Sequence, residues 1–96
     1  MIQKAFLKEK ILDSIIITFR SRTDTLDFVS KLRSLGGMVT TITTPKEANV
    51  GCGLSAKTSE NNVYLVRRVL NSFRFRSFAG VFKMTEKYGR KIIKPY

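Results

Sequence analysis

The chain has 96 residues, enough for one domain, and 43% of them are apolar, the share of an ordinary globular protein rather than of a disordered basic tail. It carries 18 Lys and Arg against 7 Asp and Glu, a formal net charge of +11. The lack of His excludes His–metal sites, Ser–His–Asp triads and Cys–His dyads, and the single Cys excludes an intrachain disulfide. Covalent chemistry must therefore use one thiol, carboxylates or basic side chains.

The first third of the chain predicts a helical extension, a strand and a helix. Residues 1–13 carry apolar side chains at a rough helical spacing, which predicts a short amphipathic helix. The β-branched run Ile15–Phe19 predicts a strand that is buried on both faces. Thr23 and Asp24 then offer a helix cap and a first-turn anion, and Gly36 ends the helix. The apolar stripe of this helix consists of Leu26, Val29, Leu32 and Leu35, with Phe28 beside them.

The middle of the chain predicts two strands and a second helix. β-Branched residues favour a strand over Met38–Thr44, and Pro45 ends it. A short alternating segment, Leu54–Lys57, predicts a third strand, after which Ser59 caps a helix. The stripe of that helix consists of Val63, Val66, Leu70 and Phe73.

A fourth strand is predicted over Phe78–Met84, with Phe78 and Phe82 on the helix-covered face. Tyr88-Gly89 can turn a small hairpin that brings back Ile92 and Ile93. The resulting β-α-β-β-α-β order is that of the α+β, ferredoxin-like split βαβ fold: a four-stranded antiparallel sheet with two helices on one face. We divide the chain into an N-terminal extension (1–13), one domain (14–84) and a basic C-terminal tail (85–96).

The positive charge is concentrated in residues 57–96, which carry ten basic and two acidic side chains. Such a concentration attracts polyanions, and nucleic acid is the commonest of these. A solvated helix face with a solubilising tail explains the same charge equally well. The residues expected to contact a polyanion are Arg67, Arg68, Arg74, Arg76, Arg90 and Lys91.

The loop between the second and third strands holds the only thiol, Cys52, between Gly51 and Gly53. Glycine neighbours leave a thiol open to close approach, whereas a buried Cys packs as a small inert hydrophobe. A reactive thiol also needs a lowered pKa, which nearby cations or a helix N-terminus provide. The cations within reach are Lys46, Arg20 and Arg22, if the sheet brings the two loops together.

Two motifs in this region resemble the putative selenium/sulfur carrier-like proteins, a family of small bacterial domains. The first is Ile17-Thr18-Phe19-Arg20-Ser21 at the end of a strand. The second runs from Thr44-Pro45-Lys46-Glu47 to Cys52-Gly53-Leu54-Ser55, and Lys46 stands where the family usually has Arg. The resemblance covers about residues 14–84.

The resemblance implies that Cys52 carries a persulfide or selenosulfide between donor and acceptor proteins, as a carrier or accessory protein rather than a turnover enzyme. The expected site residues are Cys52 as the carrier thiol, Pro45, Lys46, Glu47, Gly51 and Gly53 as its loop, and Arg20, Ser21 and Lys46 as thiolate-stabilising or anion-binding groups. We expect neither a cofactor nor a metal.

Two other functions remain open: a nucleic-acid-binding module that uses the basic C-terminal half, and a small regulatory domain that dimerises. A single unpaired thiol fits a reducing compartment, which predicts a cytoplasmic protein. No apolar run is long enough to span a membrane.

Overall fold

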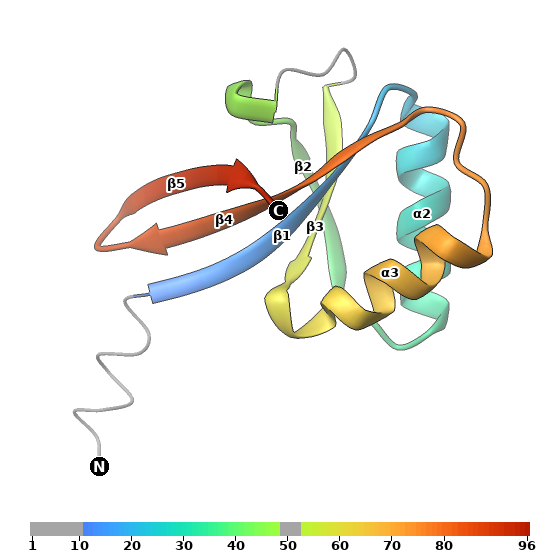
Figure 1. Ribbon diagram of the computed structural model, residues 1–96, viewed down its shortest axis with the longest axis horizontal. Helices are drawn as coiled ribbons and strands as arrows, with labels where there is room; N and C mark the ends of the chain where they lie inside the picture. Colours follow the sequence, from blue (N-terminus) through green and yellow to red (C-terminus); the bar gives the residue numbers. More distant parts are fainter. Residues whose placement is uncertain (1–10, 49–52) are drawn as a thin grey trace.

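The computed structural model describes residues 11–48 and 53–96. Five strands and two α-helices are joined by short connections, two of which contain a 3₁₀ turn (Figure 1). In chain order the elements are β1 (Ile11–Phe19), α2 (Arg22–Ser34), β2 (Val39–Thr43), the 3₁₀ turn η1 (Lys46–Ala48), β3 (Leu54–Ser59), the 3₁₀ turn η2 (Glu60–Asn62), α3 (Val63–Ser72), β4 (Phe78–Lys87) and β5 (Arg90–Pro95).

The strands form one antiparallel sheet in the order β2-β3-β1-β4-β5. The α+β class is confirmed, but the prediction of four strands was wrong because the segment after β4 returns as β5. Tyr88 and Gly89 make the tight turn between them with φ of 53° and 81°. Positive φ at both turn residues matches the right-handed twist of a two-stranded hairpin, so the hairpin predicted at this dipeptide is confirmed.

The first strand begins earlier than expected, at Ile11. Residues 11–13 pair with Lys87–Thr85 of β4, so the prediction of a helix over 1–13 was wrong for these three residues. The rest of that predicted helix lies outside the described residues. The helical spacing was misleading because a strand partner 72 to 76 residues away in sequence pairs with the backbone of this segment instead.

The buried face of α2 differs from the predicted stripe by about one residue. The buried side chains are Thr25, Phe28, Val29 and Leu32, whereas Leu26 and Leu35 are exposed. Ser21, rather than Thr23, is the N-cap, and its Oγ accepts a hydrogen bond of 2.9 Å from the Asp24 backbone N–H. The C-terminal end is as predicted, because Gly36 adopts a φ of 90° that ends the helix. Packing of the helix against the sheet sets its rotation and places the polar Thr25 inside, where its hydroxyl lies within hydrogen-bond distance of the Leu54 carbonyl.

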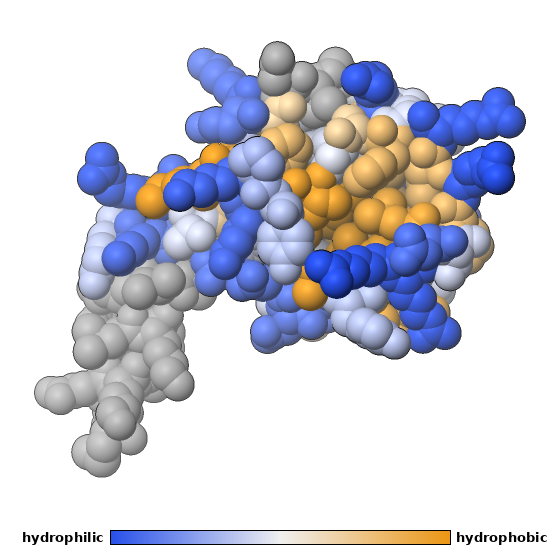
Figure 2. Space-filling model, viewed as in Figure 1, coloured by the Kyte–Doolittle hydropathy of each residue, from blue (hydrophilic) through white to orange (hydrophobic). Residues whose placement is uncertain are grey.

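The second helix starts with the turn η2, which Ser59 caps through a hydrogen bond from the Asn61 N–H. In α3 itself the buried residues are Val66 and Val69. Leu70 is partly buried and packs against the core as predicted, whereas Phe73 is 44% exposed, so the predicted stripe was wrong at Phe73. Figure 2 shows the consequence: hydrophobic residues reach the surface between β4 and the two helices.

The sheet has one face covered by both helices and one face without a helix. Ile15, Ile17 and Phe19 of β1 pack with the helices in the core, whereas Ile16 points to the helix-free face. Phe82 lies opposite Ile16 in the register, so its predicted place on the helix-covered face was wrong. Phe78 does lie beside Phe19, but it is 40% exposed.

The helix-free face is concave because the two edges of the sheet approach each other across it. β5 is the edge strand next to β4, yet it lies beside η1, which follows the opposite edge strand β2. The curl buries side chains that no helix covers: Ile16 is fully buried and Met84 is 3% exposed. Strong sheet twist is the general cause of such coiling.

Candidate functional site

The connection between β2 and β3 contains the predicted thiol site, and the structure describes both of its ends. The Thr44 N–H donates a 2.9 Å hydrogen bond to the Gly53 carbonyl, which continues the β2–β3 ladder by one step. The hydroxyl groups of Thr44 and Ser55 lie 2.6 Å apart. On the β2 side, the Ala48 N–H donates to the Pro45 carbonyl and closes the turn η1. The two ends of the connection are therefore fixed to each other.

Of the predicted loop residues, Pro45 is half-buried directly before η1, and Lys46 and Glu47 are exposed within η1. Gly53 is exposed and directly precedes β3. Cys52 and Gly51 lie outside the described residues. The assignment of these side chains to a thiol site stays a prediction.

The β1–α2 connection lies at the same end of the sheet as the thiol loop. Thr18 of β1 pairs with Ser55 of β3, so the chain leaves β1 next to the start of β3. The buried Thr25 hydroxyl lies 3.2 Å from two carbonyl oxygens, those of Ser21 and Leu54, and is shared between them. This contact joins the N-terminus of α2 to the strand that follows the thiol loop. Sequence reasoning missed Thr25, because its contact is with a strand residue 29 positions away and leaves no local pattern.

A second contact holds the β1–α2 connection to the segment before β4. The Asp24 carboxylate accepts hydrogen bonds from the Ser77 N–H at 3.0 Å and the Ser77 hydroxyl at 2.6 Å. Ser77 in turn accepts from the Ser21 N–H, and its carbonyl accepts from the Arg20 N–H at 2.7 Å. Asp24, Ser21 and Ser77 thus form a polar clamp, and Ser21 has a structural role in it as well as at the helix cap.

The predicted cations are exposed. Arg20, Arg22 and Lys46 all have exposed side chains, and none of them forms an ion pair with another residue of the described ranges. Arg20 sits at the clamp and Lys46 at η1, on the two connections that meet at this end of the sheet. Their guanidinium and ammonium groups are available to an anion approaching either connection.

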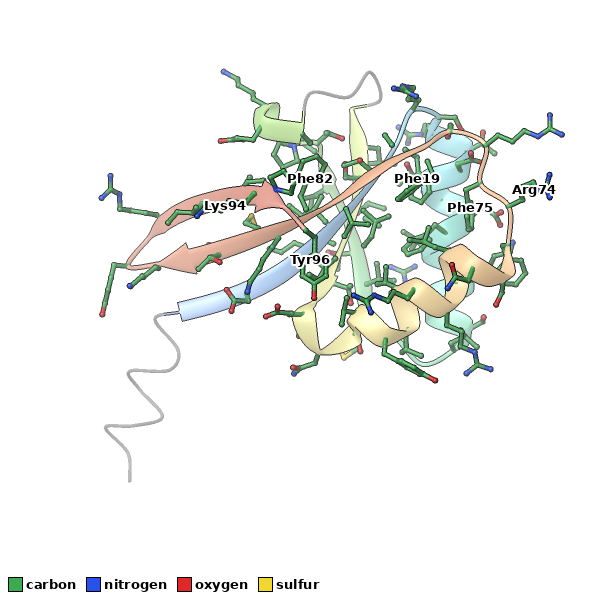
Figure 3. All side chains as sticks on the ribbon, viewed as in Figure 1. Phe19, Arg74, Phe75, Phe82, Lys94 and Tyr96 are labelled. Atoms are coloured by element: carbon green, nitrogen blue, oxygen red, sulfur yellow. The ribbon has the colours of Figure 1, made fainter. Side chains whose placement is uncertain are left out.

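The six residues expected to contact a polyanion fall into two groups. Arg67 and Arg68 are exposed on α3, and Arg74 and Arg76 are exposed in the segment that follows it. Arg90 and Lys91 begin β5. Figure 1 shows the start of β5 and the segment after α3 at opposite ends of the long axis, and Figure 3 labels Arg74 at one of them. The two groups of expected contact residues therefore lie apart along the long axis.

Comparison with known proteins identifies the relationship. The family model described as "Putative Se/S carrier protein-like" matches residues 14–77, two-thirds of the chain. The chain belongs to this Se/S carrier-like family. The match begins within β1 and ends at Ser77 of the clamp, so it contains both connections described above. No curated protein and no solved structure matches the chain.

Two further features of the described residues bear on the site of this Se/S carrier-like domain. No helix among them is long and apolar enough to cross a membrane. They contain no group of three or more His, Cys, Asp or Glu side chains that could hold a metal ion.

Replacing Gly53 by Ala is expected to leave the fold unchanged. A Cβ placed on Gly53 meets no atom within 4 Å, and its φ is not in the left-handed region. The free energy of unfolding, measured by thermal denaturation, should therefore change by no more than about 0.5 kcal/mol, as for an ordinary surface substitution. The rate of Cys52 modification by a neutral thiol reagent in this variant then reports the access that the neighbouring glycine provides. A large loss of stability would contradict the open surroundings of Gly53.

Proposed function

We propose that this protein is a thiol carrier, in which Cys52 accepts a sulfur or selenium atom from a donor protein and yields it to an acceptor protein. The observation that carries the proposal is the family match over residues 14–77, which includes the Pro45-to-Cys52 loop. The described ends of this loop support it, because the bond from Thr44 to Gly53 fixes where the loop leaves and rejoins the sheet.

The transfer needs no external oxidant. The Cys52 thiolate attacks the outer sulfur of a donor persulfide, a new S–S bond forms at Cys52, and the S–S bond of the donor breaks. The donor leaves as a thiolate, and the transferred atom keeps its oxidation state. Discharge repeats the step with an acceptor thiolate as the nucleophile. Selenium follows the same bond changes with a selenium atom in the outer position.

The composition and the charge around the loop suit this chemistry. The chain has one Cys, so no second thiol of the same molecule can attack a loaded Cys52 and discharge it as a disulfide. The exposed cations Arg20 and Lys46 lie on the two connections at this end of the sheet. Cations near a thiol favour the thiolate, which is the reacting form.

Incubation of the wild-type protein with a cysteine desulfurase and cysteine is expected to add about 32 Da, one sulfur atom, to the intact mass. Cys52→Ser should remove the adduct completely because no other thiol is present. The adduct should also disappear after treatment with a reductant. The measurement is intact-mass spectrometry without reductant in the sample.

A synthetic peptide of residues 44–57 is the matched control, since it carries the same thiol and neighbours without the fold. With a low-molecular-weight persulfide as the sulfur donor, the folded protein should acquire the sulfur atom at least about tenfold faster than the peptide if the fold lowers the pKa of the thiol. Equal rates would show that the fold does not activate Cys52. No adduct on the wild type, under conditions that load an established carrier, would reject the carrier function itself.

A further inference from the structure

A cleft lies on the helix-free face, between η1 and β5. It has a volume of about 470 Å³ and is walled on one side by the end of β2 with η1, and on the other by β4 and β5. The cleft exists because the sheet curls until its two edges are neighbours. Cavities of about 300–1,000 Å³ are the size that small-molecule ligands occupy.

The floor of the cleft is apolar. Ile42, Met84 and Ile93 line it, and none of the three is fully exposed. Met84 and Ile93 are direct partners across the β4–β5 ladder, so their side chains emerge on the same face. An apolar surface of this kind binds the apolar body of a ligand by excluding water from both.

The rim of the cleft is cationic. Lys46, Lys57 and Lys91 line it, against one carboxylate, Glu47, among the described lining residues. Lys57 has a partner in Glu86 at 3.9 Å, whereas Lys46 and Lys91 form no ion pair within the described ranges. Lys46 is on one wall and Lys91 is on the other. Glu47 follows Lys46 and Glu86 lies opposite Lys91 in the register, but neither carboxylate is within ion-pair distance of these two lysines. A ligand in the cleft therefore meets a net positive rim, with a lysine on each wall.

We propose that this cleft binds a small organic anion, with its acidic group between Lys46 and Lys91 and its apolar body on Ile42, Met84 and Ile93. The chemistry of recognition is a charge-assisted hydrogen bond at the rim combined with apolar burial at the floor. One wall comes from the family-matched region and the other from β4 and β5, which follow it. The cleft shares Lys46 with the proposed thiol site but needs no reaction at Cys52, so benzoate binding tests it separately from sulfur loading.

Benzoate is the probe, because it joins a carboxylate to a compact apolar ring, and benzamide is its uncharged counterpart. Titration is followed by NMR of the methyl groups of Ile42, Met84 and Ile93 in the full-length protein. Benzoate should shift these signals saturably, and benzamide should bind at least about tenfold more weakly, since a charge-assisted hydrogen bond is lost. Inorganic phosphate should bind more weakly than benzoate, because it has no apolar group to contact the apolar floor.

Lys91→Gln and Lys94→Gln form a matched pair of variants. Both residues are exposed on β5, but Lys91 lines the cleft with Ile93, whereas Lys94 lies opposite Lys83 on the other face. Lys91→Gln should lower the affinity for benzoate about tenfold, and Lys94→Gln should lower it less than about twofold. Lys46→Gln, on the opposite wall, should repeat the effect of Lys91→Gln.

Four results would overturn the proposal. They are equal binding of benzamide and benzoate, preference for phosphate, equal loss in the Lys91 and Lys94 variants, and benzoate shifts that do not saturate or that centre away from the three floor residues. Unchanged signals from the core residues around Phe19 show that each variant is folded, so a loss of binding is assigned to the site.

Discussion

Replacing Phe19 by Ala is expected to lower the free energy of unfolding by about 3–5 kcal/mol. Phe19 is fully buried, and its ring lies 5.4 Å from the rings of both Phe28 and Phe75 and 5.9 Å from that of Phe78. It therefore joins β1, α2 and the segment before β4 in one aromatic cluster (Figure 3). Truncation leaves a cavity that rigid neighbours on three elements cannot close. Urea unfolding measures the change.

Phe73→Ala is the matched control, because it removes the same ring from an exposed position. Phe73 is 44% exposed, and its ring faces the Lys31 ammonium group at 4.7 Å. Its loss should cost about 1 kcal/mol, the size of an exposed cation–π contact with partial burial. A domain of this size has a total stability on the order of 5–15 kcal/mol, so only the Phe19 variant should approach unfolding. Similar losses in the two variants would show that the aromatic cluster does not organise the core.

Asp24→Ala is expected to cost about 2–3 kcal/mol, the second-largest effect. The variant removes a carboxylate that accepts from the Ser77 N–H and hydroxyl, and hydrogen bonds to charged groups contribute about 1.5–3 kcal/mol. It also removes a negative charge from the first turn of α2, where the helix dipole stabilises one. Urea unfolding gives the total loss. The rate of amide hydrogen exchange should increase most at Ser21 and Ser77, the two other residues of the clamp.

Asp27→Ala changes the same charge in the same helix and serves as the control. Its carboxylate is 47% exposed and pairs only with Lys31 at 2.6 Å among the described residues. Exposed pairs of this type contribute about 0–1 kcal/mol, so the variant should be nearly as stable as wild type. If Asp27→Ala destabilises as much as Asp24→Ala, the loss reflects helix charge rather than the clamp.

The clamp and the Thr25 contact connect the elements at the end of the sheet where the thiol loop rejoins it. Thr25 ties α2 to the strand after the loop, and the clamp ties the start of α2 to the segment before β4. Both contacts lie within the family-matched residues 14–77.

Local sequence patterns predicted those features of the fold that depend on neighbouring residues. The β-branched run at Ile15–Phe19, the glycine that ends α2 and the turn at Tyr88-Gly89 each act within a few residues, so their signals are visible in the sequence. The buried faces of the helices were harder to predict. Leu26, Leu35 and Phe73 follow a helical period but remain exposed, because helix rotation is set by packing against the sheet.

The sequence by itself determined the chemistry that this protein can use: one thiol, no imidazole, and an excess of positive charge. It also determined the family, through two motifs whose spacing is read directly along the chain. Only the tertiary structure decided which distant residues meet. Asp24 with Ser77, and Lys46 with Lys91 across the cleft, are pairs that sheet order and curl bring together. Curl depends on the twist of all five strands at once, and no local pattern in the sequence encodes it.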